Sequence, residues 1–275
     1  MTEPLNLVVA LPAEAKPIVA HYQLKRMQPE YGFPVYRREA LSLVVSGVGK
    51  ANSAAATAHL HAVNHFQKDE VWLNVGIAGH AHRSIGDVLL AHQIVDHASG
   101  QCWYPPLVMT QDIDTRKLLT LDRPSDGYPE EAMVDMEASG FIATAQRFAS
   151  SELVHCLKVV SDHSQQSVES LNAKRVQALM AVLPESIDGL HQQLGGLVKE
   201  LAGLRLPEDR VQRYLQLGRF TVSQHHQLEG LLRRWLTLAP ASDLWRAEFA
   251  GLSAAKPLLQ AIRDYVDTLP IQLRP

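Results

Sequence analysis

The sequence of 275 residues is poor in cysteine and has no strong excess of charge. Its two cysteines, Cys102 and Cys156, are too few for a disulfide scaffold and are typical of a protein in a reducing cytosol. Lysine and arginine number 26 against 29 aspartates and glutamates, so the chain carries no large overall field of either sign. This balance argues against nucleic acid or an anionic membrane as a partner.

Long apolar runs are also missing. No stretch approaches the roughly 20 residues needed to span a bilayer. The N-terminal residues, Met1 to Pro4, show neither the basic region nor the cleavage site of a signal peptide. With 46% hydrophobic and 20% charged residues, the composition is that of an ordinary globular protein. We therefore expect a soluble cytoplasmic protein with one large or two small domains.

In the first two thirds of the chain, short apolar runs alternate with helix-forming stretches. Apolar runs too short for a helix predict buried strands, here at 5–11, 41–45, 71–75, 88–95 and 154–160. Helices are predicted at 51–66 and 138–148, and a turn is predicted at 76–79 after the third strand. The alternation predicts an α/β fold with a mostly parallel sheet that helices cover on both faces.

The pattern becomes purely helical beyond about residue 184. Apolar residues recur at helical spacing between 187 and 204, and further helices are predicted at 210–217, 224–236 and 253–265. The sequence thus predicts an α/β domain at 1–184 and an all-helical C-terminal extension at 185–275. The extension could pack on the first domain or on a partner subunit, form a separate binding module, or cover the site, and the pattern leaves these roles open.

Two carboxylates stand at positions that favour chemistry. The segment 134–138 (VDMEA) places Glu137 at the start of a predicted helix, where backbone N–H groups and the helix dipole favour the ionised form. The segment 159–162 (VVSD) places Asp162 just past a predicted strand, at the sheet edge where open α/β sheets bind ligands. A carboxylate that holds hydroxyls and an acid beside the leaving group are what cleavage of an N-glycosidic bond requires.

These segments and four others resemble the purine nucleoside phosphorylase and nucleosidase superfamily, and within it most of all the 5′-methylthioadenosine/S-adenosylhomocysteine nucleosidases. The resemblance extends over about 5–183, and its segments occur in the family's order: 8–15 (VVALPAEA), 46–50 (SGVGK), 74–79 (NVGIAG), 86–87 (GD), 134–138 (VDMEA) and 160–162 (VSD). It implies an α/β fold of the phosphorylase/hydrolase type, with a mixed central sheet flanked by helices. It also implies a homodimeric nucleosidase of nucleoside catabolism and methionine salvage. Such an enzyme hydrolyses the N-glycosidic bond of a purine nucleoside or a 5′-thioadenosine derivative.

The resemblance implies a role for each site residue. Asp162, positioned by Ser161, would protonate the departing base, and Glu14 would bind and activate the attacking water. Glu137 would hold the ribose hydroxyls, and Met136 would pack on the sugar. Further substrate contacts would come from Gly76, Ile77, Ala78 and Gly79. The implied partner is a small nucleoside substrate, with no cofactor and no metal. Because the transition state is an electron-poor sugar cation, nearby carboxylates would stabilise it.

Two positions favour water over phosphate as the nucleophile. Phosphorylases of this superfamily place arginines that coordinate phosphate where this chain has Glu14 and Asn74. A carboxylate repels a phosphate dianion, and the loss of a bidentate arginine removes strong contacts. Arg83 could supply a compensating cation, so a phosphate-dependent phosphorylase stays an alternative. A degenerate nucleoside-binding or regulatory protein is the other, because Ile77 replaces the usual small hydroxyl residue and the base-gripping segment is shortened.

Each site residue also has an ordinary structural interpretation. Glu137 could be a simple helix-start carboxylate, Asp162 a helix cap for 164–167, and Glu14 a solvated glutamate in a first helical turn. The segment 46–50 completes neither a Walker A nor a dinucleotide motif and predicts a tight turn. Without cysteines or carboxylates at ligand spacing, no metal site is predicted at His80, His82, His92 and His97. Contacts to the base are left open among Phe33, Trp103, Tyr104 and 121–122.

Overall fold

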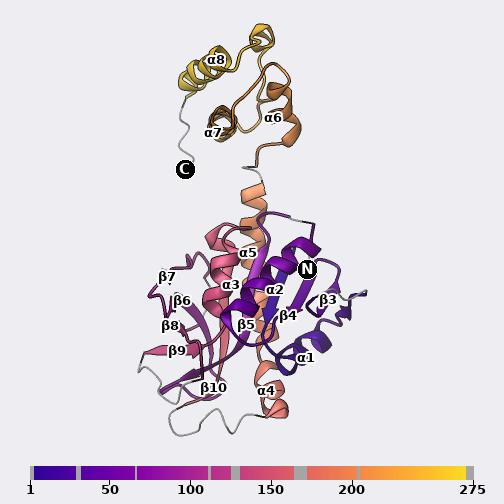
Figure 1. Cartoon of the computed structure of the whole chain (residues 1–275), viewed down its shortest axis with the longest axis vertical. Helices are drawn as coiled ribbons and strands as arrows, with labels where there is room; N and C mark the ends of the chain where they lie inside the picture. The colour runs from indigo at the N-terminus through magenta and orange to yellow at the C-terminus, as the bar shows by residue number, and fades with distance from the viewer. Residues whose placement is uncertain are drawn as a thin grey trace. The chain divides into compact units, whose positions relative to one another are not determined.

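The computed structural model describes residues 3–28, 32–65, 67–110, 113–124, 131–163, 172–202 and 205–270. The chain divides into two compact units, Met1–Val198 and Lys199–Pro275. The first is an α/β unit and the second is helical (Figure 1). The division falls within helix α5 (Leu183–Ala202), later than the boundary predicted after residue 184. The first half of α5 packs on the α/β unit, where the Tyr22 hydroxyl donates to the Pro184 carbonyl at 3.2 Å.

Ten strands among the described residues form one sheet at the centre of the α/β unit. They are β1 (Leu5–Val9), β2 (Lys25–Arg26), β3 (Val35–Arg38), β4 (Leu41–Val45), β5 (Val71–His80), β6 (Val88–Asp96), β7 (Cys102–Trp103), β8 (Thr115–Thr120), β9 (Ala132–Asp135) and β10 (Val154–Asp162). Their order is β10-β6-β8-β9-β5-β1-β4-β3-β2, with β7 paired to β6. Because β10 also pairs with β5, the strands β5, β9, β8, β6 and β10 close into a ring.

The central strands β4, β1, β5 and β10 run parallel to one another. All residues of β1 and β4 are buried, as expected for parallel strands that helices cover on both faces. Antiparallel pairs join β3 to β4, β9 to β5, and β6 to β10. The sheet is therefore mixed, which confirms the fold class that the family resemblance implies. It is less parallel than the alternation of elements alone predicts.

Helices cover the sheet in two layers. Helix α1 (Pro12–His21) connects β1 to β2 and the β3–β4 hairpin on one side of β1, whereas α2 (Lys50–Val63) connects β4 back to β5 on the other side. Right-handed crossovers in opposite directions place these two helices on opposite faces. Helix α3 (Ala138–Ala145) packs with α2, and α4 (Ala173–Met180) packs with α1 (Figure 1).

A glycine makes the α2–α3 contact close. A Cβ on Gly140 would lie 1.9 Å from the carbonyl oxygen of Lys50, so any larger residue would push the two helices apart. The predicted helix 51–66 ends at Val63 in the structure, and Phe66 lies outside the described residues. The contact brings the turn before α2 next to the start of α3, which bears Glu137.

The predicted turn at 76–79 is wrong. These residues continue β5, which runs to His80, and β10 likewise includes Asp162. The two strands pair along this part, with Lys158 opposite Gly76 and Asp162 opposite Gly79, so backbone hydrogen bonds extend the strands past the glycines. The short strands β2, β3, β7, β8 and β9 were not predicted, because they are brief or carry few consecutive apolar residues.

The second unit contains α6 (Glu208–Leu215), α7 (Val222–Leu238) and α8 (Ala255–Thr268), which confirms a helical C-terminal region. Its aromatic and aliphatic core includes Tyr214, Leu228, Leu232, Trp235, Phe249, Leu258 and Ile262. Arg234 is solvated beside this core and pairs with Asp267 at 2.6 Å. Over the described part of the chain, no helix combines the length and the apolar character that crossing a membrane requires.

Candidate active site

A cavity of about 250 Å³ lies where β1, β5 and β10 end and α3 begins. Its size is close to the lower end of the range for small-molecule sites, about 300–1,000 Å³. Of the nine predicted site residues, eight line it: Glu14, Ile77, Ala78, Gly79, Met136, Glu137, Ser161 and Asp162. The structure therefore brings together three carboxylates that are far apart in sequence.

Glu14 is held by backbone N–H groups from two elements. Its Oε2 accepts from the N–H groups of Ala10 and Leu11 at 2.9 and 2.8 Å, and its Oε1 accepts from the N–H of Ile77 at 3.0 Å. The residue is only 2% exposed, so the solvated glutamate considered from the sequence is wrong. Burial raises the pKa of Glu14, while these hydrogen bonds and the cation of Lys158 oppose the rise. The carboxyl is thus fixed and basic.

Gly76 is the predicted site residue that does not line the cavity itself, yet its missing side chain shapes the site. A Cβ at this position would lie 2.8 Å from Glu14 Oε1 and 3.6 Å from Lys158 Nζ. The glycine therefore leaves the space in which the Glu14 carboxylate and the Lys158 amine approach β5.

Glu137 does not cap its own helix. The first turn of α3 is capped by Asp135, whose Oδ2 accepts from the Ala138 N–H at 3.0 Å, and by the hydroxyl of Thr120, which accepts from the Ser139 N–H at 3.0 Å. The Glu137 carboxylate is 7% exposed and accepts instead from the N–H of Gly49 at 2.8 Å.

This environment corrects the expected charge state of Glu137. Burial and the neighbouring Asp135 raise its pKa to about 7, although Lys158 and the Gly49 N–H oppose the rise. The helix dipole was expected to hold the carboxylate ionised, but burial outweighs it. Gly49 has φ +103°, a conformation open mainly to glycine, so the turn at 46–50 serves to direct one N–H at Glu137.

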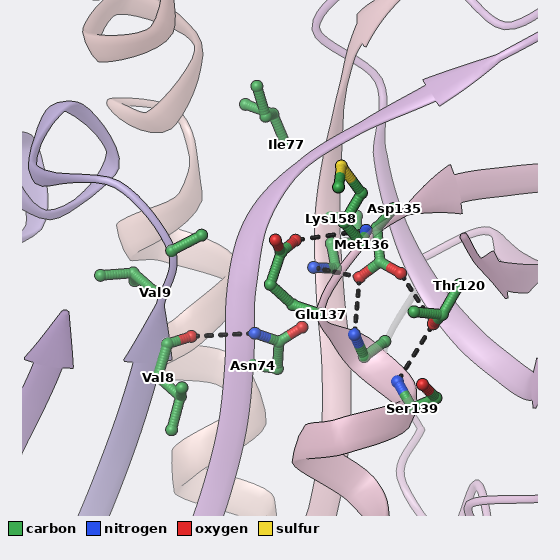
Figure 2. Close-up of polar contacts among 12 residues, drawn as sticks. Val8, Val9, Asn74, Ile77, Thr120, Asp135, Met136, Glu137, Ser139 and Lys158 are labelled. Carbon is green, nitrogen blue, oxygen red and sulfur yellow. Dashed lines mark hydrogen bonds and ion pairs between the residues drawn. The ribbon is translucent and has the colours of Figure 1, made fainter. Parts of the chain in front are cut away.

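A buried lysine, missed by the sequence reasoning, joins the carboxylates. Lys158 Nζ lies 2.9 Å from Asp135 Oδ2, and both side chains are almost completely buried. Figure 2 shows the amine between the Asp135 and Glu137 carboxylates. Burial alone would lower the pKa of Lys158, but Asp135 and Glu137 raise it above its ordinary value, so the amine is charged. A lysine inside the apolar run of β10 was the signal that could have identified it.

Asp135 is the second member that sequence reasoning missed. Its Oδ1 accepts from the Thr120 hydroxyl at 2.9 Å, and its Oδ2 accepts from both the Ala138 N–H and Lys158 (Figure 2). All of these groups are buried, and the carboxylate is fully satisfied. Asp135 thus fixes the start of α3 and the amine of Lys158 together.

Asp162 is the last residue of β10. The Ser161 hydroxyl donates to Asp162 Oδ1 and lies 3.3 Å from the Ala78 carbonyl oxygen. Asp162 is 3% exposed and lines the cavity. A helix cap at 164–167 lies outside the described residues.

The residues considered for phosphate binding lie elsewhere. Asn74 is buried within the sheet and donates from Nδ2 to the Val8 carbonyl at 3.1 Å (Figure 2). Arg83 pairs with Asp114 at 2.7 Å and lines a different cavity, so it is not the compensating cation considered from the sequence. Among the described lining residues of the candidate site, Arg123 is the cationic side chain, beside Pro124. Neither was predicted, and Phe33, Trp103, Tyr104 and 121–122 do not line this cavity.

The histidine-rich region lines another cavity, of about 760 Å³, to which His80, His82 and His92 contribute. The backbone N–H groups of His82 and Arg83 donate to His80 Nδ1 at 3.2 and 3.3 Å. Within the described ranges, no group of three or more histidine, cysteine or acidic side chains is arranged to hold a metal ion.

Comparison with known proteins identifies the architecture around this site. Residues 4–115 match the family model described as "Phosphorylase superfamily". The α/β unit has the fold of this superfamily. The resemblance inferred from the six sequence segments is thereby confirmed. No curated protein matches the sequence.

Solved nucleosidases share the phosphorylase-superfamily fold. A 5′-methylthioadenosine/S-adenosylhomocysteine nucleosidase from Helicobacter pylori, complexed with butyl-thio-DADMe-Immucillin-A, gives a TM-score of 0.58 at 14% identity over 70% of this chain and 99% of its own. The Neisseria meningitidis nucleosidase with methylthio-immucillin-A gives 0.53 at 19% over 66% and 96%. Futalosine hydrolase from Helicobacter pylori gives 0.54 at 15% over 70% and 99%. At these identities the likeness is one of fold.

Proposed function

We propose that the protein is a nucleosidase that hydrolyses the N-glycosidic bond of a purine nucleoside or of a 5′-thioadenosine derivative. The observation that carries the proposal is the meeting of Glu14, Glu137 and Asp162 in one cavity. The solved proteins of the same fold include nucleosidases with bound nucleoside analogues, which supports the substrate class.

In the proposed reaction Asp162 acts as the acid for the departing base. A purine leaves far more readily when a ring nitrogen gains a proton. The Ser161 hydroxyl donates to one oxygen of Asp162, and Asp162 lines the cavity. The carboxylates around the sugar position stabilise the positive charge that develops as the bond breaks. Lys158 limits the repulsion among these carboxylates without entering the lining of the cavity.

Water is the proposed nucleophile, and Glu14 is its general base. Three backbone N–H groups hold the Glu14 carboxyl, and burial raises its pKa, which favours taking a proton from water. Glu137 would bind the ribose hydroxyls and Met136 would pack on the sugar, with Ile77 to Gly79 as further contacts. Four carboxylates line the cavity beside the single cation Arg123 of the described lining, an environment that repels a phosphate dianion.

Release of base from a panel of purine nucleosides, with and without phosphate, tests the proposal. We expect base release in phosphate-free buffer and a loss of at least about a hundredfold in kcat for Asp162→Asn, because general acid catalysis contributes about 10²–10⁴-fold. Phosphate-dependent release would instead identify a phosphorylase, for which Arg123 would be the first candidate phosphate ligand. Binding of nucleosides without release would identify a degenerate binding protein.

We also propose a cytoplasmic homodimer in nucleoside catabolism, with methionine salvage as the pathway if methylthioadenosine is the substrate. Exposed apolar side chains after β7 support a subunit contact: Tyr104 is 65% exposed and Val108 is 56% exposed. Sedimentation equilibrium of the full chain tests the dimer. A monomer at micromolar concentration would contradict it.

A further inference from the structure

Lys50 joins two segments of the chain that each contribute a residue to the lining of the candidate site. Lys50 Nζ lies 2.7 Å from Asp122 Oδ1 and 2.8 Å from Asp96 Oδ2. Two residues before Lys50 in the chain, Val48 lines the cavity from the turn before α2. Directly after Asp122, Arg123 lines it from the segment that leaves β8. The ion pair with Asp122 therefore joins two cavity walls that come from different parts of the chain.

The Asp96 half of this arrangement is anchored in the core. Asp96 Oδ2 also accepts from the Ser139 hydroxyl at 2.9 Å, and its Oδ1 accepts from the N–H and the hydroxyl of Ser99, both at 2.9 Å. Although burial opposes it, Lys50 and these donors hold the pKa of Asp96 well below its usual range. Asp96 is therefore an ionised carboxylate, fixed by its hydrogen bonds, that anchors the Lys50 amine. Ser139 links it to the first turn of α3.

The Asp122 half is the exposed one. The Asp122 side chain is 54% exposed, whereas that of Asp96 is 8% exposed. Directly before Asp122, the Leu121 N–H donates to the Asp135 carbonyl at 2.8 Å. The ion pair of Asp122 with Lys50 connects this segment to the start of α2. Arg123 and Pro124 follow immediately and line the cavity.

We propose that Lys50 is a positioning residue for substrate binding, which holds the Arg123–Pro124 wall against the Val48 wall through its ion pair with Asp122. The inference rests on the proposed nucleosidase function for its substrate. The Lys50–Asp122 ion pair and the two walls that it joins, here called the clamp, are a property of the described contacts. It assigns to the lysine of the 46–50 segment a role that a tight turn alone does not explain. Because Lys50 acts through other residues, its loss should weaken binding more than chemistry.

The chain offers a matched control for this ion pair. Asp114 pairs with Arg83 at 2.7 Å and its side chain is 62% exposed, so it resembles Asp122 in geometry and exposure. Asp114 directly precedes β8, whereas Asp122 follows it, and neither Asp114 nor Arg83 lines the candidate site. Asp114→Ala thus removes an equivalent surface ion pair without touching the proposed clamp.

The test compares Asp122→Ala, Lys50→Met, the double variant and Asp114→Ala, with 5′-methylthioadenosine as the probe substrate. For Asp122→Ala we expect KM to rise about three- to fivefold, the upper range for an exposed ion pair, with kcat within about twofold of the parent. Lys50→Met should raise KM at least as much, and the double variant should be no worse than Lys50→Met, because both remove the same pair. Asp114→Ala should leave KM unchanged. An unchanged KM in Asp122→Ala, an equal rise in Asp114→Ala, or additive effects in the double variant would overturn the clamp.

Hydrogen–deuterium exchange separates this inference from the proposed function. Amide exchange in the peptide that contains 121–124 should be faster in Asp122→Ala and Lys50→Met than in the parent and in Asp114→Ala. If the parent chain releases no base but exchange rises as expected, the proposed function fails and the clamp stands. If base is released and exchange is equal in all variants, the clamp fails and the proposed function stands.

Discussion

Replacement of Glu137 by glutamine is expected to make the α/β unit more stable and less active. Burial and Asp135 raise the pKa of Glu137 from 4.5 to about 7. A raised pKa means that the folded unit binds a proton that the unfolded chain has already lost between these two pH values. The stability linked to this proton is fully present below pH 4.5 and is lost as the pH rises through 7.

The shift sets the size of the effect. Holding the ionised carboxylate in the folded unit at pH 8 costs about 3 kcal/mol, since one pKa unit corresponds to about 1.36 kcal/mol. Glutamine carries no charge, and its side-chain oxygen can still accept from the Gly49 N–H. The variant should lie within about 1 kcal/mol of the parent at pH 5 and exceed it by up to about 3 kcal/mol at pH 8, a rise in Tm of about 6–12 °C for a unit of this size. Activity should fall about a hundredfold, because charged hydrogen bonds to the ribose hydroxyls are lost.

Differential scanning calorimetry of the full chain at pH 5, 6, 7 and 8 measures the stability, and the transition of the α/β unit is the one that Glu137→Gln shifts. Glu185→Gln is the control, because Glu185 is an exposed glutamate of the same unit. A stability difference for Glu137→Gln that is constant from pH 5 to 8, or that favours the parent at pH 8, would refute the argument that burial of this carboxylate is unfavourable.

Three further predictions concern packing and charge. Gly76→Ala should lower activity at least tenfold and destabilise the α/β unit by about 1–3 kcal/mol, because its Cβ would lie 2.8 Å from Glu14 Oε1. Initial rates measure the activity and urea unfolding measures the stability. A fully active variant would contradict the close approach of Glu14 to Gly76. Lys158→Met should destabilise the α/β unit by about 3–5 kcal/mol in urea titrations at pH 7, because it leaves buried carboxylates without their cation. An unchanged free energy of unfolding would contradict a charged amine at this position. Gly140→Ala should severely destabilise the α/β unit, because its Cβ would collide with the Lys50 carbonyl. Gly196→Ala, on α5 with open space around it, should stabilise by up to about 1 kcal/mol. Thermal melts of both variants check this, and similar effects at the two sites would contradict the close α2–α3 contact.

The sequence predicted the candidate site better than it predicted the elements that carry it. Asp162 and Glu14 were recognisable because each lies in a family segment, Asp162 as the last residue of a buried strand and Glu14 in the helix that follows one. The 76–79 turn was wrong because glycine commonly ends strands, and the reason for Gly76 lies in side chains from α1 and β10 that a local pattern does not contain. Lys158 escaped notice for a related reason, since a lysine in an apolar strand has meaning only when its carboxylate partners are known.

The sequence by itself determined the class of the protein. Apolar runs of strand length, helical spacing beyond residue 184 and six ordered segments sufficed for an α/β unit of the phosphorylase-superfamily fold and a helical C-terminal region, because these depend on local periodicity and on backbone geometry at glycines. The tertiary structure decided the electrostatics of the site. Whether Glu137 is ionised, which carboxylate caps α3 and which cation offsets the buried charge depend on burial and on distances between segments far apart in the chain. Such energies arise only when the strands and helices are packed.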